Sequence, residues 1–153
     1  MIESLDDARE ELKRVDHLIY VSLKYTRTVD VLLNSVKRMV EAYDFMFETL
    51  LRKAKEEKKI PEVPKTPIEK GNLIKEIYSE DQQTIDNVEL YFLMRKLART
   101  INPYKEQEFR RHVMMKTIID GKEQILNIDI ITEYYHYMLD FYKKVEKIIL
   151  NKE

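Results

Sequence analysis

Residues 26–30 read Thr26-Arg27-Thr28-Val29-Asp30, and they stand within a stretch that has no glycine or proline before Pro61. Because these two residues break helices, a long stretch without them favours helix. One unbroken helix from residue 4 to residue 58 would be about 80 Å long, too long for a compact domain of this size. The run Thr26, Thr28, Val29 disfavours helix because these side chains are β-branched, and Thr28 is a good N-cap. The sequence therefore predicts a turn near residues 27–30 between two long antiparallel helices.

Each of the two predicted helices carries an apolar stripe. On the first helix, apolar or small residues recur at Leu5, Ala8, Leu12, Val15, Ile19, Ser22 and Thr26. On the second helix, they recur at Leu32, Leu33, Val36, Val40, Tyr43, Phe47, Leu50 and Ala54. This spacing of three and four residues puts each set on one face of a helix. We expect the two faces to pack together.

The glycine and proline residues after residue 58 divide the rest of the chain into shorter predicted elements. Residues 59–66 form a predicted loop, and Thr66 followed by Pro67 marks the start of a short helix. A capping pattern that begins at Ser79 predicts the start of a further helix. This helix is apolar on most of its circumference, so we expect it to lie in the centre of the bundle. Asp129 is the predicted cap of the last helix. The buried stripe of that helix is expected at Ile131, Tyr134, Met138, Phe141, Val145 and Ile148.

Residues 108–128 break the helical rhythm and indicate a β-hairpin. Asp120-Gly121 between β-rich flanks favours a two-residue turn, which pairs Ile119 with Lys122. In this register one face of the hairpin holds four apolar residues that cover a core: Val113, Met115, Leu126 and Ile128. The predicted fold class is therefore mainly α, an antiparallel helical bundle in one domain (residues 1–153) with one docked β-hairpin.

Composition excludes several classes of protein. The chain has 44% hydrophobic and 36% charged residues, a net charge of −1 and no cysteine. The last feature excludes disulfides and thiolate metal sites. No apolar stretch approaches the roughly 20 residues that a membrane span requires, and the acidic start is unlike a signal peptide. We expect a cytoplasmic protein, and abundant Lys and Glu are typical of thermophiles.

No motif points to catalysis, a metal or a cofactor. Two glycines fifty residues apart form neither a phosphate-binding loop nor a nucleophile elbow. Glu133 and His136 have the Glu-x-x-His spacing of di-iron proteins, but this spacing occurs once where such a site needs it twice. We interpret His136 instead as a surface partner of Asp140.

Two sets of cations form candidate sites for an anion or a nucleic acid. The first set shares one side of the first helix: Lys13, His17, Tyr20, Lys24 and Arg27. Cations beside an aromatic ring and an imidazole can bind a phosphate, a nucleotide or a carboxylate. The alternative is a charged helix face that is simply solvated.

The second set comprises Arg110, Arg111 and His112, which are expected on the first strand of the hairpin. A basic hairpin can follow a phosphate backbone. The alternatives are charges that protect an edge strand from aggregation, and a structural pair of His112 with Asp129, which lies opposite it in the predicted register.

The helical layout of residues 1–58 and 79–151 resembles the HEPN superfamily, small helical proteins linked to RNA cleavage or to nucleotidyltransferase partners. Active members carry an Arg-x4–6-His motif on one helix. None of the three histidines here has an arginine at that spacing, so the resemblance does not imply nuclease activity. The segments 16–20 and 24–28 also resemble uncharacterised archaeal proteins.

Three functional hypotheses follow. The first is a non-catalytic binding or assembly protein, a homo-oligomer or the partner of another protein. The second is an RNA- or nucleotide-associated protein that uses the two cation sets. The third is a hydrolase or nuclease centred on His17.

Overall fold

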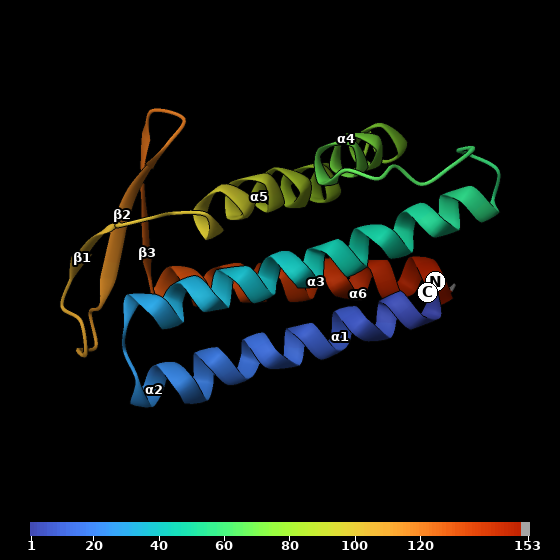
Figure 1. Cartoon of the computed structure of the whole chain (residues 1–153). Helices are drawn as coiled ribbons and strands as arrows, with labels where there is room; N and C mark the ends of the chain where they lie inside the picture. Colours follow the sequence, from blue (N-terminus) through green and yellow to red (C-terminus); the bar gives the residue numbers. More distant parts are fainter. Residues whose placement is uncertain (151–153) are drawn as a thin grey trace.

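The chain reverses direction at Thr26–Thr28, between a helical first arm at residues 2–25 and the long helix α3 (Val29–Glu56). The computed structural model describes residues 1–150. The Thr28 hydroxyl accepts a hydrogen bond from the Val31 amide at 3.3 Å, which caps α3. Figure 1 shows the two arms lying side by side and antiparallel. The predicted turn and its cap are confirmed.

The first arm is not a uniform α-helix. It consists of α1 (Ile2–His17), a π-helical turn η1 (Leu18–Ser22) and a short α2 (Leu23–Tyr25). The buried stripe runs as predicted to Ile19, then continues at Leu23 rather than at Ser22, and Thr26 is exposed. A π-turn spaces its hydrogen bonds five residues apart instead of four, so it moves the following residues around the helix. The stripe predicted beyond Ile19 was therefore wrong.

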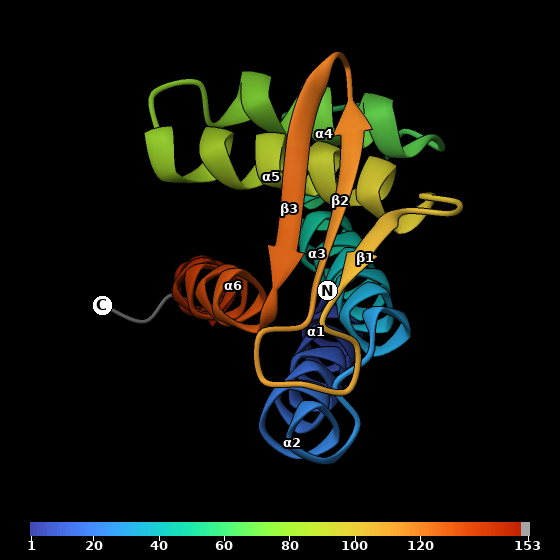
Figure 2. The same cartoon turned by 90° about the vertical axis from the view of Figure 1, so that its left-hand side faces the viewer.

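Helix α3 occupies the centre of the bundle. It packs against α1 and α6 (Ile128–Leu150) on one side and against α4 (Pro67–Ile77) and α5 (Gln82–Ala98) on the other (Figures 1 and 2). Helix α5, whose apolar circumference predicted a central position, contacts α3, α4, α6 and the strand β2 (Met114–Ile119). Its Tyr91 packs on Tyr43 and Phe47 of α3. Its Phe92 lies against Gly71 of α4, where a Cβ atom would come within 2.6 Å of the ring.

Four aromatic rings form the middle of the core, and three helices supply them. Phe47 stacks on Tyr43 with centroids 5.4 Å apart, and it meets Tyr91 edge-on at 4.9 Å and 90°. Phe141 of α6 lies 6.2 Å from both Tyr43 and Phe47. Such offset and edge-to-face arrangements are the favoured ones for aromatic pairs. All four rings are fully buried.

Buried polar pairs fix how the helices are placed along one another. The Tyr43 hydroxyl donates to Asn87 Oδ1 at 2.6 Å, which joins α3 to α5. The hydroxyls of Ser4 and Thr49 lie 2.7 Å apart and join α1 to α3. A shift of either helix would leave a buried polar group without a partner, so these pairs specify one packing arrangement.

The small sheet contains the predicted hairpin and one strand that the sequence did not reveal. Its strand order is β1 (Tyr104–Glu106), β2 (Met114–Ile119), β3 (Lys122–Asn127), and all pairs are antiparallel. Ile119 pairs with Lys122 as predicted. The turn residues Asp120 and Gly121 have φ of 51° and 80°, which suits a tight hairpin turn.

The hairpin docks on the helices, with β2 against α5 and β3 against α6 (Figure 2). On its inner face Val113, Met115 and Leu126 are fully buried and Ile128 is half-buried. The fold is therefore mainly α-helical with a docked β-hairpin, as the sequence predicted. Within residues 1–150, no helix is both long enough and apolar enough to cross a membrane.

Several local predictions need correction. Residues 110–112 lie in a turn before β2, not on the strand, because the backbone is held there by bonds within the loop. The side chain of Asn127 caps α6 by accepting from the Ile130 amide at 2.8 Å, so Asp129 falls in the first turn. On this helix Tyr135 is buried, whereas Tyr134, which was predicted in the buried stripe, is half-buried. Asp81 caps α5 in place of Ser79.

The loop and helix start predicted between residues 59 and 67 are confirmed. After α3 ends at Glu56, turns lead to Thr66, whose hydroxyl accepts from the Glu69 amide at 3.2 Å. Pro67 is the first residue of α4, where its missing N–H costs nothing. The following helix α5 ends at Ala98.

Candidate functional site

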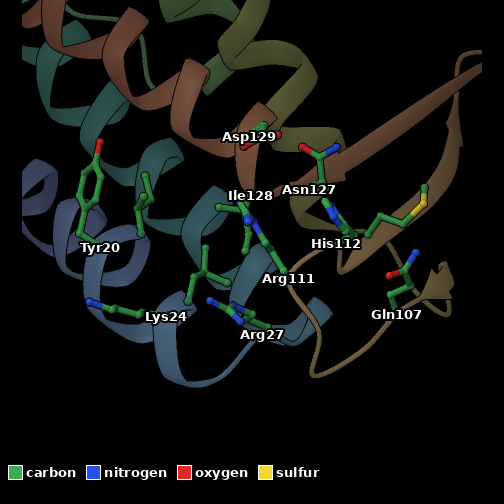
Figure 3. A pocket seen from close by; sticks show the side chains of 12 residues that line it. Tyr20, Lys24, Arg27, Gln107, Arg111, His112, Asn127, Ile128 and Asp129 are labelled. Carbon is green, nitrogen blue, oxygen red and sulfur yellow. The ribbon is translucent and has the colours of Figure 1, made fainter.

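A cavity of about 620 Å³ opens where three segments meet: the end of the first arm, the loop at residues 107–113 and the start of α6 (Figure 3). We call it the corner cavity, and the segment 107–113 the corner loop. Its polar lining residues are Tyr20, Lys24, Arg27, Gln107, Arg111, His112, Asn127 and Asp129. Its apolar lining residues are Ile19, Leu23, Met114 and Ile128.

The corner cavity brings together members of both predicted cation sets. Tyr20, Lys24 and Arg27 come from the first set, and Arg111 and His112 come from the second. In Figure 3, Arg27 and Arg111 lie in the middle of the lining, between Tyr20 and Lys24 on one side and His112 and Gln107 on the other. Two surfaces about eighty residues apart in the sequence thus form one wall.

Three predicted site residues, Lys13, His17 and Arg110, do not line this cavity. His17 lies in a separate hollow on α1, beside Lys13, Arg14 and Glu10. The π-turn follows His17 directly, so the even helical spacing that linked it to Lys24 and Arg27 is interrupted. Arg110 is exposed on the corner loop and is not among the lining residues.

Two hydrogen bonds attach the corner loop to the turn between the arms. The Phe109 amide donates to the Arg27 carbonyl at 2.6 Å. The Val29 amide donates to Glu108 Oε2 at 3.0 Å, which places a carboxylate at the N-terminus of α3, where the helix dipole favours negative charge. These contacts hold Arg111 and His112 opposite Arg27.

We predict that Glu108→Ala detaches the corner loop. The change should lower the free energy of unfolding by about 1–2 kcal/mol, because a charge-assisted hydrogen bond at a helix N-terminus is lost. Urea denaturation measures this effect, with Glu62→Ala, an exposed glutamate of another loop, as the matched control. If the two variants were equally stable, the proposed attachment would be wrong.

The corner loop contains unusual backbone geometry. Gln107 and Phe109 have φ of 53° and 68°, a left-handed conformation that is uncommon for residues other than glycine. The Arg110 amide donates to the Gln107 carbonyl at 3.0 Å, and the Val113 amide donates to the Arg110 carbonyl at the same distance. Such strain persists only where surrounding contacts impose it, and it is frequent at binding sites.

The cations of the corner cavity are not neutralised by neighbouring acids. Within the described chain, Lys24, Arg27 and Arg111 take part in none of the ion pairs that engage other cations. Asp129 is the one carboxylate among the described lining residues. Three positive charges therefore face a single negative charge, in a chain whose net charge is −1.

Arg27 adds a second electrostatic feature. Its Nε is buried and has no hydrogen-bond partner within residues 1–150. Buried polar atoms are rarely left unpaired, and an unpaired one calls for a specific explanation. The first turn of α6 also lies at this wall, so the positive end of its dipole adds to the local potential. An anion bound in the cavity would be favoured by this dipole and by the charge of Arg27.

The orientation of Tyr20 is fixed by α6. Its hydroxyl lies 3.0 Å from Nε2 of His136, and its ring meets Tyr135 edge-on at 6.4 Å. Tyr135 in turn donates to Asp16 Oδ2 at 3.0 Å. Burial, together with the hydrogen bond to Asp16, raises the pKa of the Tyr135 hydroxyl, so this group stays protonated and remains a donor.

Two histidine pairs expected from the sequence are absent from the described residues. His136 bonds with Tyr20 instead of with Asp140. His112 and Asp129 line the same cavity, yet no hydrogen bond or ion pair joins them in the described structure. Residues 1–150 also contain no group of three or more His, Asp or Glu side chains placed to hold a metal ion.

Several lining residues were not predicted as site residues: Gln107, Asn127, Ile128 and Asp129. Their positions depend on where the corner loop docks and where α6 begins. The sequence contained a signal for only one of these four residues, Asp129. Its predicted pairing with His112 placed it beside the second cation set.

Comparisons of the chain with protein-family models, with curated proteins and with solved structures found no match. The function is therefore inferred from the geometry of the corner cavity.

Proposed function

We propose that the protein is a non-catalytic binding protein whose corner cavity takes a phosphate-bearing ligand. The observation that carries the proposal is the convergence of Lys24, Arg27 and Arg111, without ion-pair partners in the described chain, on one cavity. Arginine presents its donors in a planar fork that matches phosphate oxygens, and lysine adds a point charge. The volume of about 620 Å³ falls within the range of small-molecule sites.

The remaining lining residues favour a nucleotide over inorganic phosphate. Tyr20 supplies an aromatic ring, and Gln107 and Asn127 are amide side chains of the kind that bond to base edges. Asp129 can accept a hydrogen bond from a sugar hydroxyl.

Calorimetric titration with AMP, adenosine and inorganic phosphate tests the proposal. We expect AMP to bind more tightly than either fragment, and binding to raise the melting temperature, because a ligand of the folded state stabilises it. Adenosine serves as the control that lacks the phosphate. Equal binding of AMP and adenosine, or no binding of any of the three, would contradict the proposal.

An assembly role is the second candidate, and the outer surface around the sheet favours it. Ile101, Tyr104 and Ile118 are large, exposed apolar or aromatic residues near the hairpin. Clusters of such residues mark surfaces that contact other proteins. We propose that a second copy of the chain covers them.

Light scattering at increasing protein concentration tests this second candidate. We expect an oligomer that Ile118→Asp converts to the monomer, because burying a charge in an apolar contact is costly. The control Glu123→Asp leaves the charge of the neighbouring strand unchanged. A wild-type protein that stays monomeric at all concentrations would exclude the assembly role.

A further inference from the structure

Two exposed aromatic residues belong to the segments that form the corner cavity, although they are not among its lining residues. Tyr25 at the end of α2 is 79% exposed, and Phe109 on the corner loop is 76% exposed. Both belong to the segments that supply the cavity's cations, and the Phe109 amide bonds directly to the Arg27 carbonyl. Two large exposed rings on segments that also supply cations offer apolar surface that a bound ligand can cover.

The Phe109 ring is exposed on a residue whose backbone is strained. Its φ of 68° is a left-handed conformation that is unfavourable for a bulky side chain, and its amide is fixed at 2.6 Å from the Arg27 carbonyl. A smaller residue or glycine would meet the same backbone demand more easily. A ring that is kept exposed in a strained conformation is better explained by a ligand than by packing.

Rings and cations also alternate along these segments. Lys24 precedes Tyr25, and Phe109 precedes Arg110 and Arg111. Of these, Lys24 and Arg111 line the cavity, whereas Tyr25, Phe109 and Arg110 are exposed residues beside them in the sequence. Basic side chains that follow a backbone, together with rings on which bases stack, are the features of single-strand binding surfaces.

We propose that the ligand is single-stranded nucleic acid, with a phosphate on Arg27 and Arg111 in the cavity and adjoining bases stacked on Tyr25 and Phe109. This inference rests on the proposed function and extends it, because a free mononucleotide would occupy the cavity and leave both rings unused. A duplex keeps its bases stacked inside and would not engage the rings.

Fluorescence anisotropy with an unstructured RNA of about 12 nucleotides, within the usual site sizes of such surfaces, tests the inference. The variant is Tyr25→Ala/Phe109→Ala, which removes both rings and no charge. We expect its affinity for the RNA to fall by about 30-fold or more, since two stacked bases are lost and each contributes a factor of about five or more. The dependence on salt should not change, because the same phosphates are neutralised.

Three controls make the result specific. Tyr104→Ala removes an exposed tyrosine that does not line the cavity, and it should bind as the wild type does. AMP should bind the double variant as tightly as it binds the wild-type protein, because the cavity is intact. Single-stranded DNA of the same sequence and the corresponding duplex complete the series, and we expect the duplex to bind most weakly.

The outcomes separate this inference from the proposal beneath it. If AMP binds but the RNA binds no more tightly than AMP, or the double variant binds RNA normally, the inference is wrong and the proposed function stands. If neither ligand binds, both are wrong. Self-association that Tyr25→Ala/Phe109→Ala abolishes, in a protein that binds no oligonucleotide, would assign the rings to a contact between copies and overturn the inference.

Discussion

Phe47→Ala should lower the free energy of unfolding by about 3–5 kcal/mol, the largest stability effect that we expect from any single substitution. Phe47 is 1% exposed and contacts aromatic rings from three helices, namely Tyr43 on its own helix, Tyr91 on α5 and Phe141 on α6. Truncation removes the buried ring and leaves a cavity that rigid neighbours cannot fill. The favourable edge-to-face contact with Tyr91 is also lost.

Guanidinium denaturation measures the effect, and Ile68→Ala is its matched control. Ile68 is a large apolar residue that is exposed on α4, so its truncation should change stability by less than about 0.5 kcal/mol. If Phe47→Ala cost less than about 1 kcal/mol, α3 would not be the centre of the core.

Arg27→Ala/Arg111→Ala should weaken AMP binding by at least about 100-fold, the largest functional effect that we expect. A hydrogen bond to a charged group contributes about 1.5–3 kcal/mol, and each 1.4 kcal/mol corresponds to about a tenfold change in affinity. Arg27 and Arg111 both line the corner cavity, where in the described chain neither has an ion-pair partner that would compete with the ligand.

Calorimetry on the double variant and on both single variants measures the loss and the coupling between the two arginines. Arg9→Ala/Arg99→Ala removes the same charge from exposed positions outside the cavity, so it should leave the affinity within about twofold if the effect is local. Equal losses in the two double variants would indicate non-specific electrostatic attraction and would contradict a site at Arg27 and Arg111.

The long-range layout of this fold could be predicted from the sequence because local signals marked its main reversals. Thr28 caps α3, Pro67 begins α4, and Asp120-Gly121 closes the hairpin in the expected register. Each of these signals depends on residue types with a strong local preference, so a single sequence is enough to find them.

The predictions from sequence were wrong where the local structure depends on backbone geometry and not on residue type. The π-turn at Leu18–Ser22 contains no glycine or proline that would mark it in the sequence, yet it moved the buried stripe from Ser22 to Leu23. Strand β1 has only three residues and pairs through backbone groups that any sequence provides. Asn127 replaced Asp129 as the cap of α6 by one local hydrogen bond.

The candidate site was predicted in two halves, and only the structure joins them. Lys24, Arg27, Arg111 and His112 were selected from charge and spacing, but the bond from the Phe109 amide to the Arg27 carbonyl involves main-chain atoms alone. A contact between main-chain atoms about eighty residues apart cannot be predicted from the pattern of side chains. His17 and Arg110 had the same chemistry as the other candidates and differ from them only in position.

The most direct test of the central claim is the map of backbone amide chemical shifts during titration of the isotopically labelled protein with AMP. We predict saturable shifts confined to residues 19–27, 107–112 and 127–129, the three segments that form the corner cavity. Saturable shifts centred on another part of the molecule, such as the outer surface of the hairpin or the hollow beside His17, would show that the cavity is not the phosphate site.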